Sequence, residues 1–281
     1  MAPEPKKLHS GPARRATLLE RLTSLFQPIL MYTVVFTNGF IPALISQLHN
    51  LFNPSKLPLV FSPSAWRDAI LKDGMPVILR EGDKLAKDYK QHIVGRYASG
   101  KVFELGAGSG ETLQYYDVNK ISSLYLIEPF EELLPSLFAS IKSRGPGFES
   151  KTKVVPVYVE NRGALSDMGV QQGTFDTVVL VQVLCSIRDP GAHLAYLQSL
   201  LKPGGQLLIF EHVASKNSLT LLFQRLINPV WSYLARGCRL DRHSADVILQ
   251  LGGWSHSEIL RPEEEHDGAL FPRAAARFVK A

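Results

Sequence analysis

A short glycine-rich stretch and two carboxylates have the spacing of a nucleoside-binding site. The apolar run Val102–Leu105 predicts a buried strand, and the loop that follows has Gly106, Gly108 and Gly110. Glycine lets the backbone approach a ligand closely, because a side chain would occupy the ligand's space. A second apolar run ends in Glu128, whose carboxylate can accept hydrogen bonds from both hydroxyls of a ribose. The pattern therefore predicts a site for an adenosine-containing cofactor at the carboxyl edge of a parallel sheet.

Two departures from the dinucleotide-binding pattern indicate which cofactor this is. That pattern is G-x-G-x-x-G, whereas here the third glycine comes one residue early, at Gly110, and Glu111 follows it. A further acidic residue, Glu104, precedes the loop. Its carboxylate would repel a pyrophosphate and attract the cationic end of S-adenosylmethionine. The residues therefore favour a methyl-donor site over the site of an NAD-dependent oxidoreductase.

The donor site is expected to draw on residues at the ends of several predicted strands. The Phe130 ring could pack on the adenine or belong to the core. Asn161 could read the adenine edge through its amide or a backbone N–H, and ordinary turn chemistry is the alternative. The predicted donor contacts are Glu104, Gly106, Gly108, Gly110, Glu128, Pro129, Phe130, Glu160, Asn161, Gln182 and Val183.

His212 is the candidate catalytic residue. It lies at the carboxyl end of a predicted strand and could take a proton from an incoming thiol, hydroxyl or amine; a structural histidine is the alternative. Cys185 lies beside the expected methyl group, but methyl transfer needs no enzyme nucleophile, so we interpret it as a small buried hydrophobe. The polar residues Asp241, Arg242 and His243 could border an acceptor pocket or form a solvated turn.

Composition limits the other function classes. The net charge of +5 is mild for 281 residues, and the basic residues are scattered, so we expect no nucleic-acid partner. The two cysteines are too few for a disulfide framework and form no C-x-x-C pair, so we expect no metal site. Cysteine usage points to a reducing, cytosol-facing environment.

The amino-terminal part has a different character. Residues 1–21 are predicted to be a disordered basic tail, and residues 22–64 an apolar segment followed by a proline-containing linker. No Asp, Glu, Lys or Arg occurs from Leu22 to Ser55. Because the apolar run includes Asn38, Gly39 and Pro42, a helix in the membrane interface or a re-entrant hairpin fits better than a clean span. A pair of lid helices over an apolar acceptor pocket is the alternative.

Alternating strand and helix patterns follow in residues 65–281, which are predicted to form the catalytic domain. An α/β fold with a doubly wound, mainly parallel sheet and an amino-terminal helical appendage is expected. An apolar helix is predicted over Leu219–Leu234. The predicted strands are Val102–Leu105, Leu124–Ile127, Val154–Val159, Thr177–Val183 and Gln206–Phe210.

These motifs resemble those of class I S-adenosylmethionine-dependent methyltransferases, which have a Rossmann-like fold. More narrowly, the chain is similar to a methyltransferase-like group whose animal members are membrane-associated alkyl thiol methyltransferases. The matching stretches are Glu104–Gly110, Val183–Ser186, Leu201–Gly205, Glu211–Ala214, Pro229–Trp231 and Gly237–Cys238.

The resemblance implies methylation of a lipophilic small molecule, with a thiol as one candidate acceptor. It also implies association with a cytosol-facing membrane surface, such as the endoplasmic reticulum or a lipid droplet, through residues 22–52. An O- or N-methyltransferase of lipids or secondary metabolites remains an alternative. A non-catalytic methyltransferase-fold scaffold at a membrane is a second one.

Overall fold

The computed structural model describes residues 7–281, which build an eight-stranded mixed sheet in the order β1-β7-β8-β6-β5-β2-β3-β4. Strands β6, β5, β2, β3 and β4 pair in parallel, while β8 and β7 continue the sheet antiparallel and β1 caps its edge. The strands are β1 Leu8–His9, β2 Gly100–Leu105, β3 Ile121–Ile127, β4 Thr152–Val155, β5 Phe175–Val181, β6 Leu201–His212, β7 Trp254–Pro262 and β8 Arg273–Lys280. The predicted doubly wound, mainly parallel sheet is confirmed.

The order in which the chain adds parallel strands to the sheet reverses between β2 and β5. From β2 the chain proceeds to β3 and β4 on one side, and β5 and β6 then add on the other side. In open α/β sheets, ligands bind beyond the carboxyl ends of the strands at such a switch point. The loops that follow Leu105 and Val181 therefore border the expected binding crevice.

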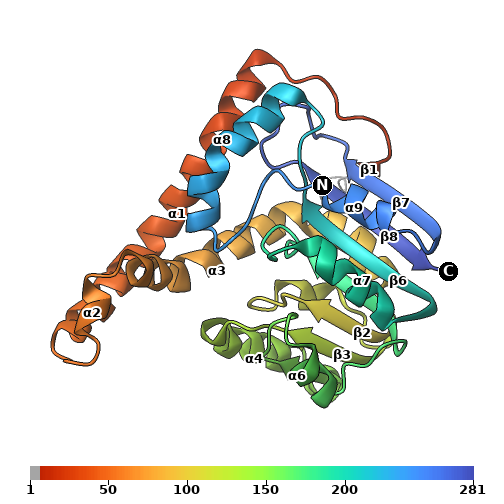
Figure 1. Ribbon diagram of the computed structural model, residues 1–281, viewed down its shortest axis with the longest axis horizontal. Coiled ribbons are helices and arrows are strands. Elements are labelled where there is room, and N and C mark those ends of the chain that lie inside the picture. Colours follow the sequence, from red (N-terminus) through yellow and green to blue (C-terminus); the bar gives the residue numbers. More distant parts are fainter. Residues whose placement is uncertain (1–6) are drawn as a thin grey trace, which may run out of the picture. The chain divides into compact units, whose positions relative to one another are not determined.

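Helices cover the central strands, whose side chains form the core. Phe103, Val178 and Leu180 are fully buried, as expected for parallel strands covered on both faces. Helix α7 packs on β5 and β6, and α9 packs on α7 (Figure 1). The α-helices are α1 Leu18–Leu51, α2 Leu57–Val60, α3 Pro63–Lys90, α4 Leu134–Ser143, α5 Pro146–Glu149, α6 Arg162–Asp167, α7 Pro190–Leu200, α8 Ser218–Leu234 and α9 Ser244–Leu251. A π-helical turn, η1 Gln91–Gly95, and two 3₁₀ turns, η2 Glu111–Tyr115 and η3 Glu131–Leu133, complete the elements.

The chain divides into two compact units, and the division differs from the expected one. One unit is Leu22–Ala86, and the other combines the described residues up to Arg21 with Lys87–Ala281. The first part of α3 thus belongs with the amino-terminal helices, because α3 runs unbroken through Gly82 and no boundary falls near residue 65. Disorder of residues 1–21 is wrong for residues 7–21: β1 pairs with β7, and the Ala16 N–H donates to Asp267. Residues 1–6 lie outside the described part.

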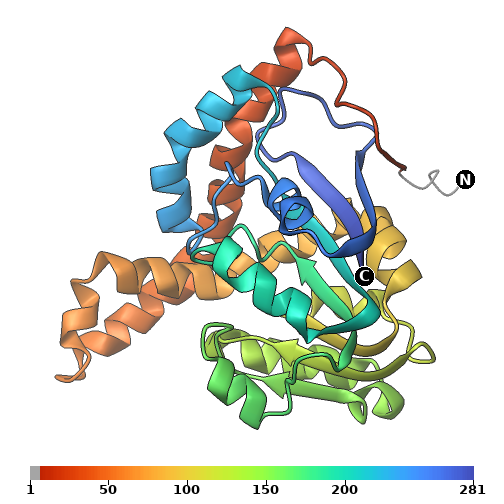
Figure 2. The ribbon, with the colours of Figure 1, turned by 45° about the vertical axis from the view of Figure 1, so that its right-hand side comes forward.

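In the amino-terminal unit, α1 is one continuous helix, so the hairpin interpretation is wrong (Figure 2). Its polar side chains do not break the helix, because they bond to its own carbonyls. The hydroxyl of Thr33 donates to the Ile29 carbonyl, and the amide of Asn38 donates to the Val34 carbonyl. Such bonds satisfy polar groups locally inside an apolar stretch.

Helices α1 and α3 pack closely through glycines. A Cβ on Gly39 would lie 2.0 Å from the carbonyl oxygen of Ile70, and one on Gly74 would lie 2.3 Å from that of Val35. The two backbones can therefore meet only because these positions lack side chains. By length and composition alone, α1 is apolar enough to cross a membrane, and most of its apolar window is exposed.

Candidate active site

The glycine loop after β2 is held open by its backbone conformation. Gly106, Gly108 and Gly110 have φ angles of +71°, +59° and +91°, a region that L-residues rarely adopt. The N–H groups of Gly106 and Ala107 both donate to the Ile127 carbonyl, at 2.8 and 3.2 Å, which fastens the loop to the end of β3. A Cβ on Gly108 would meet only the Glu111 carboxylate, at 3.6 Å. Backbone at Gly108 is thus available to a ligand.

Glu128 is fixed at the end of β3 with its carboxylate beside this loop. One carboxylate oxygen accepts from the Gly108 N–H at 2.7 Å, and the other accepts from the Phe130 N–H at 3.0 Å. Burial raises the pKa of Glu128, and these two bonds act in the opposite direction. Each oxygen retains a lone pair, so the side chain is pre-oriented to accept two hydroxyl hydrogens, as a ribose diol would supply.

Glu104 occupies a more enclosed position than the sequence suggested. It is 1% exposed, and its carboxylate accepts from the hydroxyls of Tyr116, at 2.8 Å, and Thr112. Burial raises the pKa of Glu104 to about 7 despite these bonds. Its contact with the cationic end of a methyl donor remains a prediction.

The raised pKa of Glu104 predicts a pH-dependent stability. Above its ordinary pKa of 4.5 the unfolded chain loses this proton, while the folded chain keeps it up to about pH 7. Stability should therefore fall as pH rises across this window, by about 3 kcal/mol in total from this group. Urea unfolding of the native protein and of Glu104→Gln between pH 5 and 8 measures this share. Parallel curves for the two proteins would contradict the prediction.

The expected adenine side is formed from the turns after β3 and β4. Phe130 is half-buried, with its ring edge-on to Tyr158 and under the guanidinium of Arg236. It is therefore not a core residue, and Pro129 beside it is also only partly buried. The Asn161 side-chain oxygen accepts from the Ala164 N–H and caps α6, which matches the turn interpretation. A carboxylate oxygen of Glu160 lies 3.8 Å from the Nε2 atom of His193. Adenine contacts for Glu160 and Asn161 remain predictions.

The turn after β5 is organised by a buried carboxylate. One oxygen of Glu211 accepts from the N–H groups of Val183 and Leu184, at 2.8 and 2.9 Å, and burial raises the pKa of Glu211 well above its ordinary value. Gln182 has a φ of +55°. A Cβ on Gly106 would lie 2.6 Å from Val183, so this turn touches the glycine loop. Glu211 was not among the predicted site residues, although its position beside His212 and the Glu211–Ala214 stretch of the resemblance both pointed to it.

His212 ends β6 beside this turn. Its Nε2 lies 3.3 Å from the side-chain nitrogen of Gln182, and its Nδ1 is buried with no hydrogen-bond partner among the described residues. Cys185 and Cys238 are both buried, and each donor atom of this trio lies within 4.8 Å of the others. A hydrogen bond with Cys238 and burial raise the pKa of Cys185, while the same bond lowers the pKa of Cys238. Catalysis by His212 remains a prediction.

The residues Asp241–His243, expected to border an acceptor pocket or to form a solvated turn, differ in their surroundings. Arg242 donates to the carbonyl of Leu184 and so contacts the turn after β5. Asp241 is mostly buried and pairs with Arg239, whereas His243 is exposed and lies 3.6 Å from Asp246, so His243 belongs to a surface turn.

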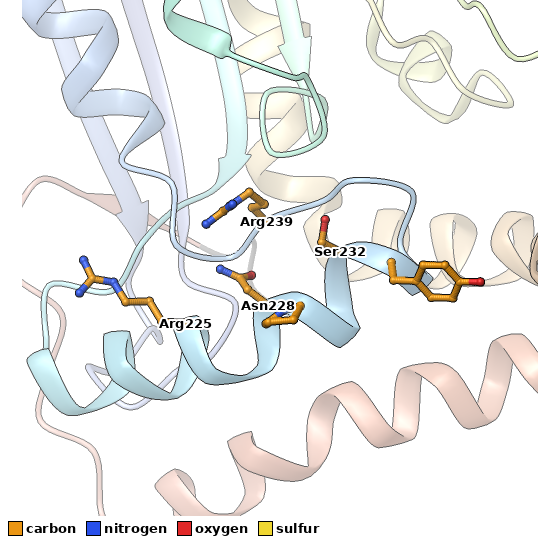
Figure 3. A pocket seen from close by; sticks show the side chains of 6 residues that line it. Arg225, Asn228, Ser232 and Arg239 are labelled. Carbon is orange, nitrogen blue, oxygen red and sulfur yellow. The ribbon is translucent and has the colours of Figure 1, made fainter. Parts of the chain in front are cut away.

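A separate polar depression of about 340 Å³ lies along α8 and the loop that follows it. Figure 3 shows Arg239 approaching from that loop above Asn228. The lining residues are Arg225, Asn228, Pro229, Ser232, Tyr233 and Arg239, none of which is a predicted donor contact.

Residues 78–254 match the family described as "Methyltransferase domain". The chain is similar to the rat protein named thiol S-methyltransferase TMT1B, with 34% identity over 51% of this chain and 55% of that protein. It is also similar to human thiol S-methyltransferase TMT1A, with 30% identity over 55% of this chain and 60% of that protein. The chain thus spans about half the length of these relatives.

The fold is similar to that of a solved O-methyltransferase family protein from Burkholderia thailandensis. The TM-score is 0.56 and the identity 14%, over 86% of this chain and 71% of that one. At this identity the likeness concerns the fold alone.

Proposed function

Because this chain belongs to the methyltransferase domain family, we propose that it transfers a methyl group from S-adenosylmethionine to a lipophilic thiol. The observation that carries the donor part is the Glu128 carboxylate, fixed by the Gly108 and Phe130 N–H groups at the switch point of the sheet. Its free lone pairs suit a ribose diol, and no phosphate-binding glycine stands at position 111.

The residues at the end of β2, β3 and β5 fit this donor. Glu128 would hold the ribose, the open backbone face at Gly108 would accept the chain beyond it, and Phe130 would flank the adenine. When bound, S-adenosylmethionine supplies an electrophilic methyl group with an excellent leaving group. The protein then has to place the acceptor in line with that methyl group and exclude water. Gln182 would contact the donor, and His212, 3.3 Å from the Gln182 side chain, would face the acceptor.

Two features support an apolar acceptor and a membrane-associated setting. Leucine, valine and tyrosine side chains form an exposed row on α8 with helical spacing. These are Leu219, Leu222, Leu226, Val230 and Tyr233. Helix α1 likewise exposes Phe26, Ile29 and Leu30. We propose that these helices contact a cytosol-facing membrane, from which a lipophilic acceptor would partition into the site.

The acceptor atom is proposed as sulfur because the relatives that match at 30–34% identity are named thiol S-methyltransferases. A thiol ionises far more readily than an alcohol, and the thiolate is the reactive nucleophile. Assays of full-length protein in lipid vesicles should compare an alkyl thiol with the alcohol and the amine of the same carbon skeleton.

We expect S-adenosylhomocysteine to form with the thiol at least ~100-fold faster than with the alcohol, because of this difference in acidity. Faster methylation of the alcohol or the amine would contradict the thiol proposal and identify oxygen or nitrogen as the acceptor atom. Binding of S-adenosylhomocysteine without turnover on any of the three would favour a non-catalytic scaffold.

A further inference from the structure

Three side chains that bind soft metals converge beside the turn that follows β5. Cys185 follows β5, His212 ends β6, and Cys238 follows α8. Their sulfur and nitrogen donor atoms all lie within 4.8 Å of one another. Around a tetrahedral zinc ion, with bonds of about 2.0–2.3 Å, such atoms lie about 3.5–3.8 Å apart. A contraction of about 1 Å or less would therefore bring them to coordinating distance.

The three ligands are held by connected backbone. The Arg239 N–H donates to the Cys185 carbonyl at 2.9 Å, which joins the loop of Cys238 to the turn of Cys185. Glu211 binds the same turn through two N–H groups and is the neighbour of His212 in β6. The trio therefore does not depend on flexible surface side chains, and a rigid frame is what a specific metal site requires.

The state of His212 also fits a ligand. Its Nδ1 is buried and finds no hydrogen-bond partner in the described chain, whereas Nε2 lies beside the amide of Gln182. The oxygen and nitrogen of such an amide are interchangeable by a flip. With the amide oxygen facing the ring, Nε2–H donates to it and Nδ1 keeps its lone pair for a metal. Metal-bound histidines commonly have their other ring nitrogen fixed in this way.

Charges around the trio are compatible with a divalent cation. Two cysteine thiolates neutralise one Zn²⁺, so the buried site would carry no net charge from metal and sulfurs. Arg242 lies near both cysteines and donates to the Leu184 carbonyl, and the buried Glu211 carboxyl group binds the turn of Cys185.

We propose that Cys185, His212 and Cys238 bind one Zn²⁺ ion through two thiolates and one imidazole. Two sulfurs and one nitrogen form a donor set that zinc prefers, and three protein ligands leave a fourth position open, as in catalytic zinc sites. This departs from the sequence-based expectation of no metal. As a metal ligand, His212 is not the general base.

The role of the ion rests on the proposed function. An acceptor thiol R–SH would occupy the open position as R–S⁻ and release its proton to solvent. A sulfur lone pair then forms the new S–CH₃ bond while the methyl–sulfonium bond of the donor breaks. The electron pair of that bond returns to the donor sulfur, and the products are the thioether and S-adenosylhomocysteine.

The test measures metal rather than activity. Full-length protein, purified without chelators from zinc-supplemented cells, should contain about one zinc per chain by elemental mass spectrometry. Replacing zinc with Co²⁺ should give the intense charge-transfer absorption of thiolate-bound cobalt. Cys238→Ser and Cys185→Ser should each reduce the bound zinc to about a tenth or less, because a hydroxyl replaces a thiolate. His243→Gln, which alters a histidine of the surface turn, should retain the full amount.

Two outcomes would overturn the proposal. One is native, folded protein without zinc, whose two cysteines both react with a maleimide only after denaturation. The other is a disulfide between Cys185 and Cys238 in protein kept under reducing conditions. Circular dichroism of each variant separates metal loss from unfolding. S-adenosylhomocysteine binding, measured on the same samples, tests the proposed donor site independently of the metal.

Discussion

Substitution of Glu128 by glutamine is expected to weaken S-adenosylhomocysteine binding by about 100-fold or more. The native carboxylate would accept two charge-assisted hydrogen bonds from the ribose, each contributing about 1.5–3 kcal/mol. In the native protein the N–H groups of Gly108 and Phe130 donate to the two carboxylate oxygens. Glutamine keeps only one oxygen, so its NH₂ group must face one of these two N–H groups. Isothermal titration of purified full-length protein measures the change.

A neighbouring carboxylate provides the matched control. Glu131 is exposed, so Glu131→Gln removes the same charge three residues away without touching the proposed ribose site. The affinity of this variant for S-adenosylhomocysteine should stay within about threefold of native, since single exposed charges contribute little to binding energy. If Glu128→Gln also stayed within threefold, the assignment of the ribose contact would be wrong.

A ligand variant separates the ribose contact from damage to the loop. An analogue without the 2′-hydroxyl should bind the native protein weakly. In Glu128→Gln the two ligands should differ much less, because the partner of that hydroxyl has already been removed. Such non-additivity is the signature of two groups in contact. Equal losses in both proteins would mean that Glu128 acts only by supporting the backbone of the loop.

The central part of the fold could be predicted because its signals are local. Each parallel strand is a short apolar run next to a glycine or proline turn, and the switch point follows from the order of these runs. The glycine loop and Glu128 are within one strand–loop–strand unit, so a single stretch of sequence contains their whole geometry. These residues lie together in the structure as expected.

The antiparallel extension of the sheet could not be recognised in the same way. Strand β8 contains Ala274, Ala275 and Ala276, and alanine is a poor strand former. In strand β7, Trp254 is followed by the polar residues Ser255–Glu258, of which the first three are exposed. Both form because β6 offers a paired edge to β8, and β8 offers one to β7. Pairing between distant segments overrides local preference here, and periodicity does not report it.

Non-local contact also explains why the sequence did not predict the proximity of three side chains beside the turn after β5. Cys185, His212 and Cys238 come from three different loops and strand ends, so no spacing rule for metal ligands applies to them. Continuity of α1 was missed for a different reason. Asn38, Gly39 and Pro42 usually interrupt helices, but in α1 the Asn38 amide bonds to its own helix and Gly39 packs on α3.

Alanine substitutions at two glycines of the same loop should fail in different ways. For Gly106→Ala, the new methyl group would lie 2.6 Å from a methyl of Val183, and the backbone must keep a φ of +71°. The conformation alone costs about 1–2 kcal/mol, and the overlap adds a comparable amount. We therefore expect a loss of about 2–4 kcal/mol in unfolding free energy, together with loss of S-adenosylhomocysteine binding.

For Gly108→Ala, the nearest neighbour of the new methyl group is the Glu111 carboxylate at 3.6 Å, which is ordinary contact. Only the cost of a φ of +59° remains, about 1–2 kcal/mol. The methyl group nevertheless points into the space that the donor would fill, so affinity should fall by about tenfold or more beyond what the lost stability explains.

The contrast between the two glycines tests whether the open face of the loop is a ligand site. Adding Val183→Ala to Gly106→Ala removes the overlapping methyl group and should recover about half of the lost stability. Gly108 offers no such rescue, because no described side chain crowds it. Unfolding in urea and titration with S-adenosylhomocysteine, run on all four proteins, separate the effects. Full donor affinity in Gly108→Ala would mean that the donor does not approach the backbone there, and the proposed site would have to lie elsewhere along the sheet edge.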